Sequence, residues 1–154
     1  MRFRFRGLSV VPFRPLFALN DNELAARGMR RMIADTQAGF PCRVSLEDAE
    51  IGERVLLTNY EHQPAHSPYR ASGPIFVRES AAEAYDGTQV PPVLRSRLLS
   101  LRAYDTDGMM VEADVVQGDQ VEEALSRLFA RDGASDVHIH NAKRGCYSCR
   151  VERG

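Results

Sequence analysis

The segment Val137–Gly154 is unusually dense in residues that could do chemistry. It holds two of the four histidines and two of the three cysteines, together with Asn141, Lys143 and Arg144. Imidazole and thiol groups can transfer protons, act as nucleophiles or bind a metal ion. Cationic side chains can hold a carboxylate or phosphate group. We therefore expect a functional site to involve this segment.

His138 and His140 alternate with the apolar residues Val137 and Ile139. Successive side chains on a strand point to opposite faces, so the two histidines share one face when the apolar pair points into the core. A His-x-His pair on a strand can supply two ligands to a metal ion. The alternative is a pair of histidines on a solvated or hydrogen-bonded face.

Cys146 and Cys149 form a Cys-x-x-Cys motif, which occurs in zinc sites and in redox pairs. If residues 146–151 form a strand, residues three apart point to opposite faces. Cys149 then lies on the side of Tyr147 and Val151. We therefore expect Cys149 to fill the core and Cys146 to be the thiol available for chemistry.

A second polar segment, Glu61–Arg70, is predicted to be a loop because two prolines exclude it from a helix interior. Its histidines, His62 and His66, therefore cannot form a helical i, i+4 zinc pair. Loops carry a large share of binding groups. Tyr69 and Arg70 are aromatic and cationic side chains of this second candidate segment, and Tyr60 lies immediately before it.

The leading hypothesis is a small-molecule-binding protein or enzyme whose site joins the two segments, which requires them to meet in space. No cofactor and no metal ligand is assigned under this hypothesis. Proton transfer and nucleophilic attack are expected from His62, His138, His140 and Cys146. The residues expected to hold a small anionic ligand are Arg43, Tyr60, Tyr69, Arg70, Asn141, Lys143 and Arg144.

Two alternatives stay open. One is a transition-metal site with at least three ligands, drawn from His62, His66, His138, His140 and Cys146. The other is a non-catalytic interaction or oligomerisation module, in which a strand at either terminus pairs across the two-fold axis of a homodimer. Nucleotide-binding and serine-hydrolase motifs are absent from the sequence, which does not decide whether the protein is an enzyme.

Composition favours one soluble globular domain covering residues 1–154. The chain is 44% hydrophobic and 27% charged, which is typical of this class. A net charge of −1 gives no reason to expect nucleic acid or an anionic membrane as a partner. No run approaches the roughly 18 apolar residues of a membrane span. The odd number of cysteines and a charged N-terminus without an apolar core favour free thiols in the cytoplasm.

Hydrophobic periodicity predicts an α+β fold built on a mostly antiparallel sheet with two main helices. Alternating patterns and β-branched residues indicate strands, and Asp105–Gly108 is a hairpin turn between two of them. The predicted strands cover residues 2–6, 43–46, 54–60, 74–78, 98–104 and 109–116, before those of the C-terminal segment.

The first predicted helix covers Asn20–Ala34, with Asn20 and Glu23 as a capping box. The second is expected to begin after an N-cap at Asp119 and to end near Gly133. A strand, this helix and the next strand also permit one right-handed parallel β-α-β crossover. The buried stripe of the second helix is expected to be Val121, Ala124, Leu125, Leu128 and Phe129.

Several separated blocks of the sequence resemble the bacterial domain of unknown function 1203 (DUF1203) family. The resemblance covers nearly the whole chain and implies kinship and a single-domain protein, without implying a reaction. The blocks that carry it are Phe40–Ala49, Leu56–Pro64, Ser67–Ser72, Gly108–Asp114 and His138–Tyr147.

Overall fold

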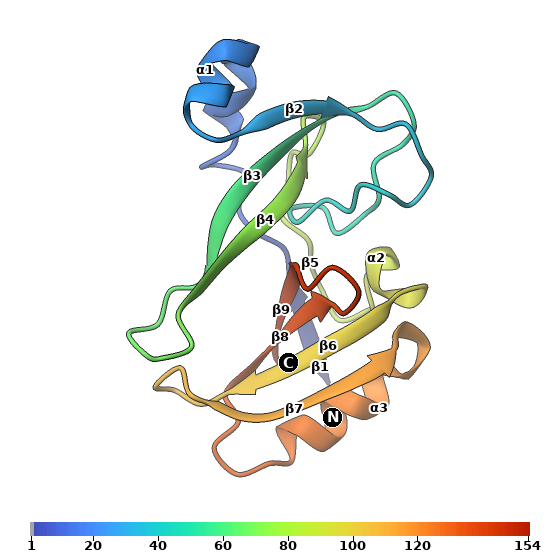
Figure 1. Cartoon of the computed structure of the whole chain (residues 1–154). Helices are drawn as coiled ribbons and strands as arrows, with labels where there is room; N and C mark the ends of the chain where they lie inside the picture. Colours follow the sequence, from blue (N-terminus) through green and yellow to red (C-terminus); the bar gives the residue numbers. More distant parts are fainter. Residues whose placement is uncertain (1) are drawn as a thin grey trace.

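Two antiparallel β-sheets form the framework of the protein in the computed structural model, which describes residues 2–154 (Figure 1). The strands are β1 (Phe3–Arg6), β2 (Arg30–Ile33), β3 (Arg54–Gln63), β4 (Ala71–Arg78), β5 (Asp86–Gly87), β6 (Leu98–Tyr104), β7 (Met110–Gln117), β8 (Asp136–Asn141) and β9 (Tyr147–Arg153). The helices are α1 (Asp21–Ala26), α2 (Pro92–Arg95) and α3 (Val121–Phe129), with short 3-10 helices η1 (Arg14–Ala18) and η2 (Gly118–Gln120). This arrangement confirms the predicted α+β class with mostly antiparallel strands.

The larger sheet has the order β5-β1-β9-β8-β6-β7, and α3 covers one of its faces (Figure 1). The predicted apolar stripe of α3 is buried against alternate residues of the strands, such as Leu101 and Ile139. Because strand side chains alternate between faces, the intervening residues of β6 and β8 point away from this core. They include Arg102, His138 and His140.

The smaller sheet has the order β2-β3-β4, and its long β3–β4 hairpin reaches the turn that joins β6 to β7 (Figure 1). The Ser67 hydroxyl donates a hydrogen bond of 2.9 Å to the carbonyl oxygen of Gly108. Gly108, the last residue of the predicted Asp105–Gly108 turn, adopts a φ of 77°. This contact holds the end of β3 beside the face of the larger sheet that carries the histidines.

The first predicted helix is much shorter than expected. The capping box of Asn20 and Glu23 is present, but the helix ends at Ala26. Gly28 has a φ of 72°, and the amides of Gly28 and Met29 donate to the last turn in a Schellman motif. The prediction was therefore wrong for residues 30–33, which form the edge strand β2 on β3.

The predicted β-α-β crossover does not produce a parallel strand pair among the described residues. Helix α3 does connect β7 to β8, but β6 lies between these strands and pairs antiparallel with both. The N-cap of α3 is also not Asp119: the residue before the helix is Gln120, without a side-chain cap, and Asp119 lies in η2. The helix ends at Phe129, before Gly133.

Both terminal strands lie inside the larger sheet, although β5 covers β1 only at Phe5 and Arg6. Strand β1 lies between β5 and β9, and β9 lies between β1 and β8. Within the described part of the chain, the free edges of the larger sheet belong to β5 and β7. No helix among residues 2–154 combines the length and the apolar character needed to span a bilayer.

Candidate functional site

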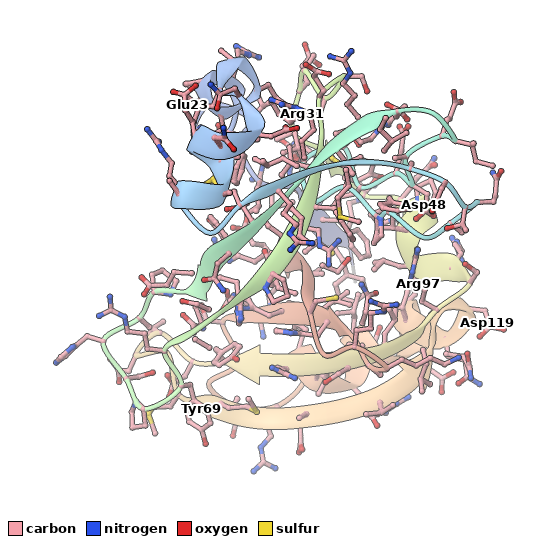
Figure 2. All side chains as sticks on the ribbon, turned by 45° about the horizontal axis from the view of Figure 1, so that its top comes forward. Glu23, Arg31, Asp48, Tyr69, Arg97 and Asp119 are labelled. Atoms are coloured by element: carbon pink, nitrogen blue, oxygen red, sulfur yellow. The ribbon has the colours of Figure 1, made fainter. Side chains whose placement is uncertain are left out.

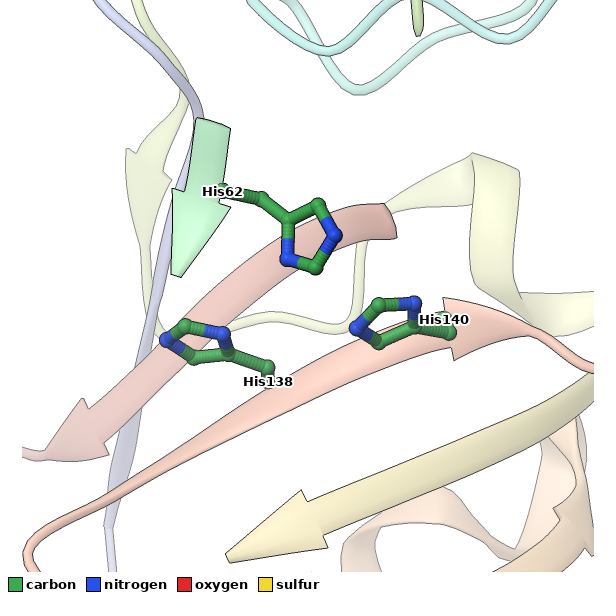
Figure 3. A group of neighbouring side chains, drawn as sticks. All are labelled: His62, His138 and His140. Atoms are coloured by element: carbon green, nitrogen blue, oxygen red, sulfur yellow. The ribbon is translucent and has the colours of Figure 1, made fainter. Parts of the chain in front are cut away.

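Three histidines from distant parts of the chain converge between the two sheets (Figure 3). Each of His62, His138 and His140 can offer one ring nitrogen such that the three atoms lie within 4.8 Å of one another. His138 and His140 project from one face of β8, as the alternation predicted. His62 belongs to β3, which continues past its predicted end at Tyr60 through a register irregularity. The two candidate segments therefore meet, with His62 on a strand and not in a loop.

The hydrogen bonds of two rings determine which nitrogen keeps a lone pair. Nδ1 of His140 lies 2.9 Å from the carbonyl oxygen of Gly145, which can only accept, so this Nδ1 carries the proton. Nε2 of His138 lies 3.4 Å from a carboxylate oxygen of Asp136 and is protonated for the same reason. The lone pairs are therefore on Nε2 of His140, which faces Nη1 of Arg102 at 3.4 Å, and on Nδ1 of His138, which has no partner among the described residues.

Two ring nitrogens of the cluster lack a hydrogen-bond partner. Nδ1 of His62 and Nδ1 of His138 are buried, and neither has a hydrogen-bond partner among the described residues. A buried polar atom without a partner costs about 1–3 kcal/mol. A ligand that accepts their lone pairs would remove this cost.

The environment keeps two of the imidazoles neutral at ordinary pH. Burial lowers the pKa of His140 to about 3, and the positive charge of Arg102 contributes in the same direction against the raising effect of the Gly145 carbonyl. Burial also lowers the pKa of His62, with further contributions from His138 and Arg102. Neutral imidazole is the form that binds a metal ion.

Tyr147 forms a wall of the cluster. Its ring is stacked on that of His62, with centroids 5.3 Å apart and planes 5° apart, and it meets His138 and His140 edge to face. The prediction that Tyr147 lies on the same side as Cys149 is wrong, because a bulge interrupts the pairing of β8 with β9. Cys149 is fully buried in the core under α3, whereas Tyr147 faces the histidines.

Arg102 is a site residue that was not predicted from the sequence. Its Nη1 lies 3.4 Å from Nε2 of His140, and residue 102 pairs with residue 138 across the β6–β8 register. On β6, Arg102 alternates with the core residues Leu101 and Ala103 and therefore points away from the core. Nothing in the local pattern indicated that β3 would cover that face.

A cavity of about 580 Å³ opens beside the cluster. His62 and His138 line it, whereas His140 does not. The cavity extends from the end of β3 to the β6–β7 turn, and Tyr60, Tyr104 and Tyr147 form part of its wall. A small molecule in this cavity would therefore reach two of the three histidines.

Most of the predicted anion-binding residues lie around a different cavity. This second cavity, of about 340 Å³, lies beside the β8–β9 turn. The predicted residues that line it are Arg43, Asn141, Lys143, Arg144 and Cys146. The structure therefore separates these residues from the histidines and places them on the other side of the β8–β9 hairpin.

The remaining predicted residues lie at the tip of the β3–β4 hairpin, where Figure 2 shows Tyr69. Tyr69 and Arg70 line neither cavity. Arg70 forms an exposed ion pair of 2.9 Å with Glu61. His66 is not part of the histidine cluster.

The fold and the site together define an α+β protein of two antiparallel sheets with a buried three-histidine cluster between them. The chain belongs to the family described as protein of unknown function (DUF1203), whose model matches residues 39–153. The matched region includes all three histidines. No curated protein and no solved structure matched the chain significantly.

Proposed function

We propose that this protein binds a divalent transition-metal ion through His62, His138 and His140. The observation that carries the proposal is the convergence of three ring nitrogens within 4.8 Å, two of them buried without a partner. Three imidazoles are a ligand set suited to Zn²⁺, Cu²⁺ or Ni²⁺. Two nitrogens held ~2.1 Å from a tetrahedral ion lie ~3.4 Å apart, so binding requires only small rotations of the rings.

The surroundings of the ligands support this assignment. Metal-binding histidines commonly donate their second N–H to a carboxylate or a backbone carbonyl, which fixes the tautomer. His138 has such a partner in Asp136, and His140 has one in the carbonyl of Gly145. The stacked ring of Tyr147 restrains His62 in the same way by packing.

The proposed centre has one coordination position left for an exchangeable ligand. Three protein ligands leave a fourth tetrahedral position open, as in catalytic zinc sites. His62 and His138 line the 580 Å³ cavity, so this position faces it. Water or a small anionic molecule could bind there, and the metal ion would act on it as a Lewis acid.

Metal titration of chelator-treated protein tests the proposal. We expect one equivalent of Zn²⁺ or Ni²⁺ to bind by isothermal titration calorimetry. The variants His62→Asn, His138→Asn and His140→Asn should each weaken binding at least tenfold, as expected when a ligand is lost. His66→Asn is the matched control, because it removes a histidine outside the cluster. Equal binding by all four variants, or none by the parent chain, would contradict the proposal.

A second candidate function is direct binding of a small anion at the same place, without a metal ion. The position of Arg102 favours it, because a guanidinium group lies 3.4 Å from Nε2 of His140. Arginine is a strong partner for carboxylate and phosphate groups. The two candidates predict opposite effects when Arg102 is neutralised.

A further inference from the structure

We propose that the 340 Å³ cavity is a second binding site, specific for a small oxyanion that also carries a hydrogen-bond donor. This cavity lies on the other side of the β8–β9 hairpin from the histidines. The proposal does not depend on metal binding. Its polar wall is formed by Arg43, Arg97, Asn141, Lys143, Arg144 and Cys146.

Arg43 supplies a buried positive charge without a negative partner. Its side chain is 2% exposed. Nε donates a hydrogen bond of 2.7 Å to the carbonyl oxygen of Tyr147, and Nη1 donates to that of Pro41. No carboxylate among the described residues pairs with it, and burial lowers its pKa against the opposing effect of the neighbouring Cys146 sulfur. A buried charge is costly unless it is paired, and a bound oxyanion would pair it.

Two further cations at the rim are free to act with Arg43. Lys143, the only lysine of the chain, and Arg144 lie at the exposed turn between β8 and β9, and within the described chain neither forms an ion pair. Arg97 is different, because Asp48 neutralises it at 2.7 Å; both side chains are labelled in Figure 2. No carboxylate residue lines the cavity. The balance of charge therefore favours a ligand with one or two negative charges.

Asn141 indicates that the ligand also donates a hydrogen bond. This residue is 9% exposed, and its Oδ1 is buried without a partner in the described part of the chain. Its Nδ2 is directed at the sulfur of Cys146, 3.5 Å away. A carbonyl oxygen repels a bare anion but accepts from a hydroxyl group. Hydrogen phosphate and hydroxycarboxylates satisfy both requirements, whereas sulfate and acetate satisfy only the first.

Cys146 provides a direct readout of this cavity. Of the three free cysteines, Cys42 and Cys149 are fully buried, so Cys146 is the thiol that reagents reach in the folded protein. We would treat the full chain with a chelator, then follow its alkylation by iodoacetamide at constant ionic strength, with the modified site located by peptide mapping. Calorimetric titration with the same anions measures binding independently of the thiol.

We expect millimolar phosphate to bind and to slow alkylation of Cys146 at least fivefold. Glycolate should have the same effect if the natural ligand is a carboxylate. Sulfate should bind at least fivefold more weakly than phosphate, and acetate more weakly than glycolate. Lys143→Gln/Arg144→Gln should lose most of this binding. Arg27→Gln is a control, because Arg27 is exposed and forms no ion pair with the described residues.

Three results would overturn the proposal. The first is the absence of phosphate and glycolate binding by calorimetry, and the second is full retention of that binding by the double variant. The third is equal affinity for phosphate and sulfate, which would remove the role assigned to Asn141. Retention of phosphate binding in His62→Asn would show that the site is separate from the histidine cluster.

Discussion

Arg102 determines which charge the histidine cluster prefers. Its guanidinium group lies beside the lone pair of His140, where it repels a metal cation and attracts an anion. We expect Arg102→Gln to raise the affinity for Ni²⁺ about threefold to tenfold, or up to ~1.4 kcal/mol. Calorimetric titration measures this change. Arg131→Gln, an exposed arginine without an ion pair to any described residue, controls for the loss of one positive charge.

The opposite result would favour direct anion binding. If Arg102→Gln leaves the affinity for Ni²⁺ unchanged and abolishes binding of acetate at the histidine cluster, direct anion binding is favoured over metal binding.

The positions of Tyr147 and His62 show what the sequence could not predict at this scale. The alternation of β8 was enough to predict that His138 and His140 share a face. A single extra residue in β9 reverses the face of Tyr147, and such a bulge leaves no mark in a pattern of apolar and polar residues. His62 joins the cluster through contacts between sheets, which depend on tertiary structure and not on local sequence.

The contact between the two hairpin tips depends on Gly108. A Cβ atom at this position would overlap the methyl group of Ala65, and the φ of 77° disfavours other residues. We expect Gly108→Ala to lower the free energy of unfolding by more than the ~1–2 kcal/mol that the conformation alone costs. Urea denaturation measures this effect.

Gly133→Ala is the matched control for Gly108→Ala. Gly133 has a φ of 86°, but no atom lies within 4 Å of the position that a Cβ would take there, so only the conformational cost applies. Adding Ala65→Gly to Gly108→Ala should restore part of the lost stability, because it removes the methyl group that the new Cβ would overlap. Equal losses for Gly108→Ala and Gly133→Ala would show that the hairpin contact contributes nothing.

Strands β3 and β4 are joined at their other ends by an ion pair between Glu53 and Arg78, 2.9 Å apart. Burial alone would raise the pKa of Glu53, but hydrogen bonds from Arg78 and Ser80 lower it below its ordinary value. The stabilisation is therefore present above a pH of about 4.3, the unfolded value, and is lost as the pH falls through the lower, folded-state pKa.

Glu53→Gln should accordingly be less stable than the parent chain at pH 7, by about 1.5–3 kcal/mol. The difference should shrink as the pH falls through the folded-state pKa of Glu53, because the side chain is then protonated in both the folded and the unfolded state. Denaturation curves at several pH values test this. Glu83→Gln, an exposed glutamate without an ion pair to a described residue, should show no such trend. A gap that stays constant with pH would contradict the assignment.

Elements were predictable where local pattern and tertiary environment agree. The stripe of α3 and the Asp105–Gly108 hairpin are examples, because burial of one face and a tight turn are both local requirements. The segment after Gly28 is the opposite case. The spacing of Met29 and Met32 fits a helix, but the chain instead pairs with β3, and pairing with a distant strand overrides a weak local preference.

At the scale of the whole molecule, a metal ion at the cluster would connect the two sheets. His62 belongs to the smaller sheet, and His138 and His140 belong to the larger one. A ligand that binds only the folded chain stabilises it by about 2.7 kcal/mol at 100 times its dissociation constant. We expect Ni²⁺ at this concentration to raise the urea midpoint of the parent chain but not that of His62→Asn. An equal rise in both would place the ion elsewhere.

The β8–β9 hairpin forms a partition between the two cavities. The backbone carbonyl of Tyr147 accepts a hydrogen bond from Arg43 on one side, while its ring rests on His62 on the other. His140 and Asn141 are likewise neighbours in sequence, but His140 belongs to the histidine cluster and Asn141 lines the second cavity. Occupancy of one cavity is therefore expected to alter affinity in the other, and thermodynamic reciprocity requires the same factor in both directions. A cation and an anion on either side of so thin a partition attract each other, so each should be held more tightly when the other is bound.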